Sequence, residues 1–547
     1  MIAPSNRFRR FGMHLAAILL ASLLFAASFP NMLFSGGIPF LAWVAYAPLF
    51  WVIRRVNLGA SVFWGALYGY GAYSLFNYWL HAFNPVAGIV VGVAYLLYFA
   101  VLCPLFKLAV ILFPRRGYIL QWLIWIAYEY LRTLGFLGYP YGITGYSQWS
   151  VLPLIQIADT FGVWGVSALV VFPSCLIAAV CKDLGSGKGE AGLRPLLAEL
   201  RSGLRRERFP LLLWGCALIG TVVYGFVTPT DYSDEPTARI ALVQTNTDPW
   251  RTDLRSYREN YLALKRLSLE ALVEGPKPDL VVWSETAFVP RIYWHTTYRD
   301  DGESWDLVKE LLDFLKTQEV PYVIGNDDAR RKLNDQGRWE RVDYNGVLLF
   351  DRGELVNQYR KLHLVPFTEY FPYEKQLPWV YQWLLKADTH LWEPGEDLTV
   401  FEINGLKFAA PICFEDVFGY LSRDFVRGGA EIIVNLSNDA WSNSLPGQMQ
   451  HLGMAVFRAV ENRRSMVRST ASGQTCGIAP SGRIIAMAEP FTEAHLTVEV
   501  PILRGETPYT RYGDLWAQVF VAAAAGMLLI GIVRGIMRRL VTKDGKK

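Results

Sequence analysis

Long runs of apolar residues constrain this chain more than any other feature of its sequence. A helix needs about 20 apolar residues to cross the hydrocarbon core of a bilayer. Runs of roughly that length lie at residues 12–30, 38–54, 60–82, 86–113, 117–136, 160–182, 208–228 and 514–533. We therefore expect a multi-pass α-helical membrane bundle.

The runs divide the chain into three expected parts. Residues 1–231 form a membrane domain with seven predicted helices, residues 232–505 a polar globular domain, and residues 506–547 an eighth membrane helix with a basic tail. The first run follows three arginines, as a signal peptide would. Because Phe29-Pro30-Asn31 is a poor cleavage site, we expect this run to remain as a helix.

The positions of Lys and Arg predict the orientation of the bundle. Arg54 and Arg55, Arg115 and Arg116, the stretch from Lys182 to Arg208 and the tail all fall on the side of the basic N-terminus. The loop from Gly138 to Asp159 has no Lys or Arg and falls on the other side. After seven spans, residues 232–505 lie on the outer side of the membrane, which is the periplasm in a bacterium. The net charge of +4 gives no reason to expect a nucleic-acid partner.

Two charged residues, Glu129 and Arg132, occur inside the run at residues 117–136. Charge at membrane depth is costly and is usually paired. Residues three apart share one face of a helix. We expect an intramembrane pair with a structural role.

The polar domain has the pattern of an α/β layered fold. Helical stretches at residues 257–273 and 305–318 alternate with short runs rich in β-branched residues. These runs lie at residues 239–244, 279–284, 321–325, 346–350, 408–413 and 431–435. Loops at strand ends project side chains into clefts, so these ends are the places to look for chemistry.

Three predicted strand ends carry Glu285, Lys361 and Cys413. Taken singly, such residues are most often a solvated carboxylate, a surface lysine and a core thiol. Taken together they suit nucleophilic catalysis, because a thiol needs a base to become a thiolate and the oxyanion needs a fixed positive charge.

The chain has six cysteines, and only Cys413 and Cys476 lie in the polar domain. A disulfide between them is one interpretation, which an oxidising compartment would permit. Since pairing would abolish the nucleophile, we interpret Cys476 as a buried free thiol. No CxxC motif or His/Cys cluster has the spacing of zinc ligands, so we expect no metal.

Longer segments resemble a known family. The order Glu, Lys, Cys at strand ends resembles the nitrilase superfamily, and the segments around it are similar to the apolipoprotein N-acyltransferases. They are residues 359–372 (YRKLHLVPFTEYFP), 412–415 (ICFE), 435–441 (NLSNDAW), 507–514 (TPYTRYGD), 145–148 (GYSQ) and 154–159 (LIQIAD). The resemblance covers essentially the whole chain and implies a nitrilase-like α-β-β-α sandwich outside the membrane.

The resemblance implies roles for individual residues. Glu285 matches the general base, Lys361 the oxyanion-stabilising lysine and Cys413 the nucleophile. Supporting roles fall to Glu369, which orients the lysine, and to Glu415, an acid needed just after the cysteine.

Aromatic residues match the substrate-binding part of the family pattern, namely Trp250 over the entrance, Phe414 and Trp441. Phe414 stands where a Tyr is usual, which removes a hydroxyl. The other departures are Thr368, Ser442, Asn443 and Ala471. None of them removes an acid, a base or the nucleophile.

The implied reaction is a two-step acyl transfer without cofactors. Cys413 takes an acyl chain from a phospholipid as a thioester, and the α-amine of the diacylglyceryl-cysteine of an apolipoprotein then accepts it. We expect a monomer in the bacterial inner membrane. Residues 376–386, rich in Trp and Leu, are expected either at the membrane interface or as a cap on the domain core.

Two other functions were weighed. A membrane-tethered amidase or nitrile hydrolase would use the same three residues with water as acceptor, and the three residues alone do not exclude it. A transporter is disfavoured because the spans show no inverted repeat. We expect neither His363 nor His451 to be a catalytic base; His363 is expected to orient its loop and His451 to lie in a helix.

Overall fold

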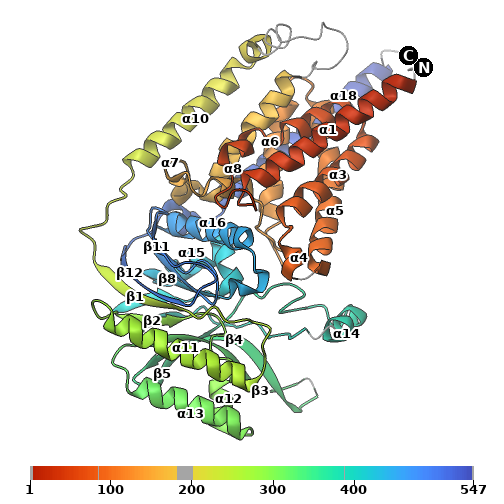
Figure 1. Ribbon diagram of the computed structural model, residues 1–547. Helices are drawn as coiled ribbons and strands as arrows, with labels where there is room; N and C mark the ends of the chain where they lie inside the picture. The colour runs from red at the N-terminus through yellow and green to blue at the C-terminus, as the bar shows by residue number, and fades with distance from the viewer. Residues whose placement is uncertain (1–3, 84, 182–200, 335, 387–388, 545–547) are drawn as a thin grey trace. The chain divides into compact units, whose positions relative to one another are not determined.

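The computed structural model of the protein describes residues 4–83, 85–181, 201–334, 336–386 and 389–544. The chain divides into two compact units. One unit comprises residues 1–228 and 512–547, and its described part is helical; the other comprises residues 229–511 and combines helices with two sheets (Figure 1). Of the basic residues used for the orientation, Lys182, Lys188, Arg194, Lys546 and Lys547 lie outside the described residues.

The helical unit is built from helices that pack through aromatic rings and small residues. Trp125 is buried against Tyr46, Phe50 and Phe106. Its described elements are α1 (Pro4–Ser28), η1 (Pro39–Trp43), α2 (Ala47–Arg55), α3 (Leu58–Phe76), α4 (Leu80–Phe83), α5 (Pro85–Leu112), α6 (Gly117–Leu131), η2 (Thr144–Gln148), α7 (Leu152–Ile155), α8 (Ala158–Val180), α10 (Arg208–Val227) and α18 (Leu515–Asp544).

Five of the eight predicted spans coincide with helices that are long and apolar enough to cross a membrane. Within the described residues these are Arg7–Ser28, Val86–Leu112, Ala158–Val180, Arg208–Val227 and Leu515–Leu540. The protein therefore has several membrane-length apolar helices, as the sequence predicts.

The other three predicted spans take a different form. The expected helix at residues 38–54 is wrong, because the segment divides into η1 and α2, each with a proline in its first turn. Proline lacks an N–H and is favoured in the first turn of a helix, and Pro39 and Pro48 lie there in η1 and α2. In the run at residues 60–82, α3 ends at Phe76 with Asn77 as its C-cap. In the run at residues 117–136, α6 ends at Leu131.

Glu129 and Arg132 do not form the direct pair that the sequence predicts. No ion pair joins them; instead each holds the same loop. Glu129 accepts a hydrogen bond from the backbone N–H of Thr144 at 2.8 Å. Arg132 donates to the carbonyl oxygens of Tyr139 and Tyr141 at 2.6 and 2.9 Å. The role is structural, but it passes through the loop before η2, whose position the sequence pattern does not reveal.

The α/β unit contains two six-stranded sheets, with strand orders β12-β1-β2-β3-β4-β5 and β11-β10-β9-β8-β7-β6. Neighbouring strands β1, β2 and β3 are parallel, as are β7, β8 and β9. The strands are β1 (Thr237–Gln244), β2 (Leu280–Trp283), β3 (Tyr322–Leu333), β4 (Trp339–Asp351), β5 (Glu354–Arg360), β6 (Val400–Ile403), β7 (Leu406–Ala409), β8 (Ile432–Ser437), β9 (Ser465–Thr470), β10 (Cys476–Ile478), β11 (Ile484–Met487) and β12 (Ala494–Pro501).

Helices cover both outer faces of the paired sheets, which gives the predicted α-β-β-α sandwich (Figure 1). The helix α11 and its neighbour α13 lie on one side, while α15 and α16 lie on the other. The helices and turns of the unit are α11 (Leu254–Val273), α12 (Ile292–Tyr298), α13 (Gly302–Lys316), α14 (Pro378–Lys386), η3 (Cys413–Val417), α15 (Gly419–Arg427), η4 (Asp439–Ser442), α16 (Leu445–Asn462) and α17 (Pro508–Tyr512).

The core of this unit follows from the apolar periodicity of its elements. The fully buried strand β2 and the buried carboxyl half of β1 place Trp283 and Val243 in one core cluster with Tyr261 of α11 and Leu311 of α13. The two sheets are joined where the Ser469 hydroxyl of β9 donates to backbone carbonyls of β1 and β2 at 3.2 and 3.1 Å. This packing fixes the strand ends on which the candidate residues lie.

Candidate active site

Glu285, Lys361 and Cys413 all follow strands of the sandwich. Glu285 lies two residues beyond β2, Lys361 directly follows β5, and Cys413 begins η3 after β7. Since β4 is antiparallel to both β3 and β5, β5 runs in the same direction as β2. Their carboxyl ends therefore share one edge of the sheet, which is why residues 76 positions apart meet there.

Lys361 lies between two carboxylates. Its side chain is fully buried, and its Nζ lies 2.8 Å from Oε1 of Glu369 and 3.4 Å from Oε1 of Glu285. Burial acts against the charged form, but Glu369, Glu285 and Cys413 together raise the pKa of Lys361 above its ordinary value. Lys361 is therefore a fixed ammonium at neutral pH.

Glu369 is held by the loop that carries it. Its other oxygen, Oε2, accepts a hydrogen bond from the backbone N–H of Val365 at 2.7 Å. Burial raises the pKa of Glu369, against the lowering effect of Lys361. A carboxylate anchored in this way keeps the lysine ammonium at one position.

Glu285 is oriented by groups on three other segments. Its Oε1 accepts hydrogen bonds from Asn345 Nδ2 at 2.8 Å and from Lys361, and its Oε2 accepts one from the backbone N–H of Asn438 at 2.9 Å. Asn345 is a residue that sequence reasoning missed, because an asparagine inside a strand carries no motif. Only the pairing of β3 with β4 brings it to the carboxylate.

Cys413 has an unusual backbone conformation. Its φ is 49°, in the left-handed region that residues other than glycine seldom occupy, and it is the first residue of η3. Asn435 Nδ2 donates to its carbonyl oxygen at 3.3 Å. Left-handed residues of this kind are concentrated at functional sites, and Thr286, next to Glu285, is another, with φ 45°.

The thiol of Cys413 responds to both of its charged neighbours. Burial and the Glu285 carboxylate raise the pKa of the thiol well above its usual value, while the Lys361 ammonium lowers it. Cys413 and Cys476 are both free, so the disulfide interpretation is wrong. The residue as a whole remains partly exposed.

Glu415 links the cysteine turn to the loop after β5. Its oxygens accept hydrogen bonds from the backbone N–H groups of Ile412 and Leu362, both at 2.7 Å, and of His363 at 3.0 Å. The phenol of Tyr359 donates to the same carboxyl at 2.7 Å. Burial raises the pKa of Glu415 to about 7. The residue fixes the spacing of Lys361 and Cys413 and makes no contact with a reacting atom.

The three predicted aromatic residues separate into a pair and a single residue. Trp250 is 62% exposed, and its ring stands edge-on to that of Trp441 with centroids 4.9 Å apart. Phe414 is buried instead, with its ring 5.0 Å from that of Phe418 and 6.1 Å from that of His363. The tryptophan pair is accessible to a ligand, whereas Phe414 contributes to packing under the cysteine turn.

Both histidines flagged in the sequence lie where they were expected. His363 holds its loop through its backbone N–H to Glu415 and through Nδ1 to the hydroxyl of Tyr420 at 2.8 Å. Burial lowers the pKa of His363 to about 4, so the ring is neutral. His451 lies in α16 and is buried among charged side chains.

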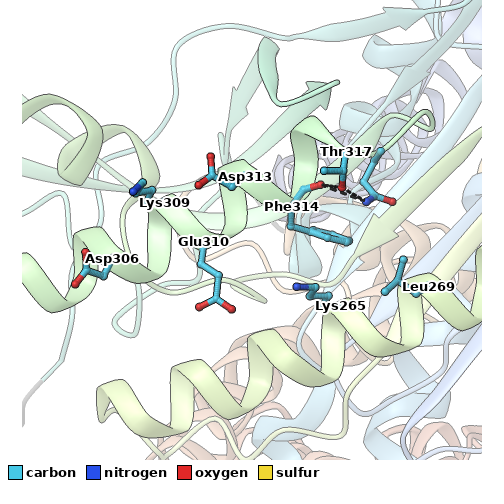
Figure 2. A pocket seen from close by; sticks show the side chains of 9 residues that line it. Lys265, Leu269, Asp306, Lys309, Glu310, Asp313, Phe314 and Thr317 are labelled. Carbon is cyan, nitrogen blue, oxygen red and sulfur yellow. Dashed lines mark hydrogen bonds between the residues drawn. The ribbon is translucent and has the colours of Figure 1, made fainter.

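A cavity elsewhere in the unit contains none of these residues. It lies between α11 and α13, has a volume of about 610 Å³ and is lined by charged side chains such as Lys265, Lys309 and Glu310 (Figure 2). Over the described residues, no group of three His, Cys, Asp or Glu side chains is arranged to hold a metal ion. The candidate residues lie instead at the strand ends around Cys413.

The arrangement there suits nucleophilic acyl transfer. A thiol lies beside a carboxylate that can take its proton and an ammonium that can stabilise an oxyanion. All three groups are fixed by hydrogen bonds from neighbouring segments, so the geometry is set before a substrate binds.

Comparison with known families adds the identity of both units. Residues 239–509 match the carbon-nitrogen hydrolase family, and residues 21–176 match the family described as apolipoprotein N-acyltransferase N-terminal domain. Among solved structures, a carbon-nitrogen hydrolase from Helicobacter pylori is 17% identical with a TM-score of 0.37, covering 51% of this chain and 94% of that one.

Similar proteins extend over nearly the full length. Apolipoprotein N-acyltransferase 1 of Treponema pallidum (strain Nichols) is 46% identical, covering 97% of each chain. Apolipoprotein N-acyltransferase 1 of Treponema denticola is 42% identical, covering 98% of this chain and all of the other. The apolipoprotein N-acyltransferase of Geobacter metallireducens is 33% identical, covering 93% of each chain.

Proposed function

The chain belongs to the apolipoprotein N-acyltransferase family, and we propose that this acyltransferase moves an acyl chain from a phospholipid to the N-terminal amine of a diacylated apolipoprotein. The observation that carries the proposal is the buried Lys361 ammonium between Glu285 and Glu369, in a site that also holds the Cys413 thiol. The reaction needs no cofactor, because these side chains supply a nucleophile, a base and a positive charge.

The first half-reaction makes a thioester. Because its pKa is raised, Cys413 is a neutral thiol at pH 7, and Glu285 takes its proton as the sulfur attacks the ester carbonyl of the phospholipid. Lys361 stabilises the oxyanion. The C–O bond then breaks, and the leaving alkoxide takes the proton from Glu285 to give a lysophospholipid.

The second half-reaction makes an amide. The α-amine of the diacylglyceryl-cysteine attacks the thioester carbonyl, and Glu285 takes a proton from the nitrogen. The C–S bond breaks and returns the Cys413 thiolate, which is reprotonated by Glu285. Glu369 and Glu415 act through position, since they hold Lys361 and the cysteine turn. The exposed Trp250 and the half-buried Trp441 contact substrate at the entrance, and Phe414 packs beneath the cysteine turn.

Lipid substrates require a site that a bilayer can reach, and α14 supports such access. Trp379 and Trp383 are 72% and 54% exposed, while only Leu384 of this helix is buried. Exposed tryptophans on an apolar helix favour the interfacial interpretation of residues 376–386 over the core cap. We further propose that the protein is a monomer of the bacterial inner membrane with residues 232–505 as a periplasmic catalytic domain. The basic loops support this orientation.

A hydrolase with the same three residues is the competing function. Intact-mass measurement of the full-length protein after incubation with phospholipid vesicles distinguishes them. We expect a mass increase of one acyl chain, lost on treatment with hydroxylamine, and absent in Cys413→Ala. Release of ammonia from small amides without an acyl adduct would favour the hydrolase.

Cys476→Ala is the matched control, because it removes another buried thiol of the same unit that the mechanism does not use. It should acquire the adduct at the wild-type rate. Subsequent addition of a diacylated N-terminal lipopeptide should discharge the adduct and yield the triacylated peptide. Acylation of the lipopeptide by Cys413→Ala would overturn the assignment of the nucleophile.

A further inference from the structure

Four buried charged side chains of the α/β unit take no part in the mechanism above. They come from four elements: Asp416 from η3, Asp439 from η4, His451 from α16 and Arg468 from β9. The side chains of Asp416 and Arg468 are completely buried, and those of His451 and Asp439 are 6% and 7% exposed. Apolar side chains could fill the same space without the cost of burying charge, so stability alone does not account for this cluster.

The four side chains form a closed ring in which acidic and basic groups alternate. His451 Nε2 lies 2.6 Å from Oδ1 of Asp416, and its Nδ1 lies 3.0 Å from Oδ1 of Asp439. Arg468 contacts the other oxygen of each carboxylate, through Nη1 for Asp416 and through Nη2, at 3.3 Å, for Asp439. Each basic group therefore bridges both acids. We name these four side chains the charge ring.

The contacts of His451 indicate a protonated imidazole. At Nδ1 the Asp439 oxygen, at 3.0 Å, is nearer than Arg468 Nη2, at 3.4 Å. Both ring nitrogens thus face carboxylate oxygens, which only accept hydrogen bonds, so both carry a hydrogen. Burial and Arg468 oppose the charge, but Asp416 and Asp439 raise the pKa of His451 to about 9. The charge ring is then neutral overall and is held by charge-assisted hydrogen bonds.

One side of the charge ring holds the turn that carries the nucleophile. Asp416 lies in η3, three residues after Cys413, which begins this turn. Residues three apart in a 3₁₀ helix lie on the same side of it, one turn apart. A displacement of the Asp416 carboxylate therefore moves the short backbone segment that carries the Cys413 sulfur.

The opposite side of the charge ring holds an amide that orients the base. Asp439 begins η4, and the residue before it, Asn438, donates its backbone N–H to Oε2 of Glu285 at 2.9 Å. The other oxygen of Glu285 is held by side chains from β4 and from the loop after β5. Through Asn438, Glu285 is therefore tied to the sheet that carries Cys413.

The remaining members of the charge ring belong to longer regular elements. His451 lies within α16, and Arg468 lies in β9, which pairs with β8 on one side and with β10 on the other. Two short turns are thus fixed to a helix and to an interior strand through one set of directional contacts.

We propose that Asp416, Asp439, His451 and Arg468 are positioning residues of the acyl transfer. They hold the Cys413 turn and the Asn438 amide at a fixed separation, so that Glu285 is in place to take the thiol proton and to return it. The proposal rests on the function proposed above, and the four side chains act through η3 and η4.

The variant Arg468→Lys separates positioning from neutralisation of buried charge. It keeps the positive charge, but one ammonium replaces the two nitrogens that reach Asp416 and Asp439 separately. We expect the limiting rate of acyl-enzyme formation to fall about tenfold, because small misplacements of reacting groups are costly. The half-saturating substrate concentration should stay unchanged. Asp439→Asn, which presents an amide donor to donors, should have the same effect.

The experiment follows the reaction of the detergent-solubilised full-length protein with p-nitrophenyl butyrate. Attack by the Cys413 sulfur forms a thioester, breaks the ester C–O bond and releases p-nitrophenolate, whose absorbance gives the rate. A small ester is used because Trp441 of η4 is assigned to lipid contact. Intact mass should show one butyryl group, absent in Cys413→Ala. Rates are measured below the unfolding temperature of each variant, where a purely structural cluster would leave them at the wild-type value.

Arg464→Lys is the matched control, because it alters another buried arginine next to β9. Arg464 donates to the carbonyl oxygens of Ala430 and Gly505 at 3.1 and 2.6 Å. Ala430 precedes β8, whereas η4 follows β8, so this arginine lies at the opposite edge of the sheet. The control should lower the unfolding temperature and leave the limiting rate unchanged.

A wild-type limiting rate in Arg468→Lys and Asp439→Asn would overturn the proposal, as would an equal loss of rate in Arg464→Lys. A higher half-saturating concentration with an unchanged limiting rate would do the same. Asp439→Asn decides the question if Arg468→Lys does not fold. A butyryl adduct without any adduct from phospholipid would count against the acyl donor proposed above and not against the charge ring. Absence of both adducts would remove Cys413 as nucleophile, and this proposal with it.

Discussion

At the scale of single residues, Glu415 shows how one carboxyl group can set the geometry of a site without entering its chemistry. It binds backbone amides on both sides of the gap between Lys361 and Cys413. Among the described residues, these backbone N–H groups are paired with the Glu415 oxygens. A change of one atom in this group therefore affects two loops.

Replacing Glu415 by Gln is expected to destabilise the α/β unit by about 3 kcal/mol, because the new amide group would face N–H donors and leave them unpaired. Acyl-enzyme formation should fall at least about tenfold as the loop and the turn separate. Thermal unfolding and intact mass measure the two effects. Glu319→Gln, which alters an exposed partner of Lys277, should change stability by less than about 0.5 kcal/mol.

His451 is expected to make stability depend on pH. Its folded-state pKa of about 9 exceeds the ordinary value of 6.5, so its contribution is complete below pH 6.5 and is lost as the pH rises through 9. The loss is on the order of 3 kcal/mol. The unfolding temperature of the wild-type protein should fall between pH 6.5 and 9.5. His451→Gln should unfold at a lower temperature, and that temperature should change less over the same pH range. An equal change of unfolding temperature with pH in both proteins would contradict a protonated His451.

At the scale of elements, Gly473 shows how closely the turn after β9 approaches Asp439 of η4. A Cβ on Gly473, in the turn after β9, would lie 2.7 Å from Cβ and 2.8 Å from Oδ2 of Asp439. The Asp439 Cβ cannot move without moving η4. The turn after β9 must therefore carry a residue without a side chain at this position.

Gly473→Ala is expected to displace Asp439, destabilise the unit by about 1–3 kcal/mol through overpacking and lower acyl transfer about tenfold. Gly302→Ala at the start of α13, where an added Cβ meets nothing within 4 Å, is the control and should be neutral. Unfolding temperature and the rate of thioester formation are the measurements. Wild-type values in Gly473→Ala would show that Asp439 has room to move.

The sequence predicts the strands and helices of the α/β unit well. It predicts poorly the contacts between side chains that lie on different strands. Strand runs such as residues 239–244 and 431–435 were identified because burial on both faces selects β-branched residues. The sequence does not reveal Asn345 of β4, since its partner Glu285 follows another strand, β2, and nothing local marks the asparagine. Apolar length alone predicts one helix at residues 38–54, whereas Pro39 and Pro48 each lie in the first turn of a separate helix.

At the scale of the whole molecule, each unit has a core of its own. The core of the α/β unit is formed entirely by its own strands and helices. The helical unit packs through its own aromatic rings. We therefore expect the α/β unit to fold without the helices.

Residues 229–511 expressed alone are expected to fold and to unfold cooperatively, with Cys413 still reactive toward iodoacetamide. Acylation by phospholipid vesicles should fall at least about tenfold relative to the full chain, because a membrane anchor raises the effective concentration of lipid. Circular dichroism and intact mass test the two statements. Loss of cooperative unfolding would show that the core depends on the helices.

The left-handed backbone at Cys413 has a consequence for how this protein evolves. A glycine would occupy that conformation without steric penalty. Replacing Cys413 by glycine would therefore relieve backbone strain at this position. Selection for folding stability alone would favour loss of the Cys413 sulfur, whereas selection for activity would retain it. Inactive descendants with a glycine at this position should therefore have a higher free energy of unfolding than their active ancestor.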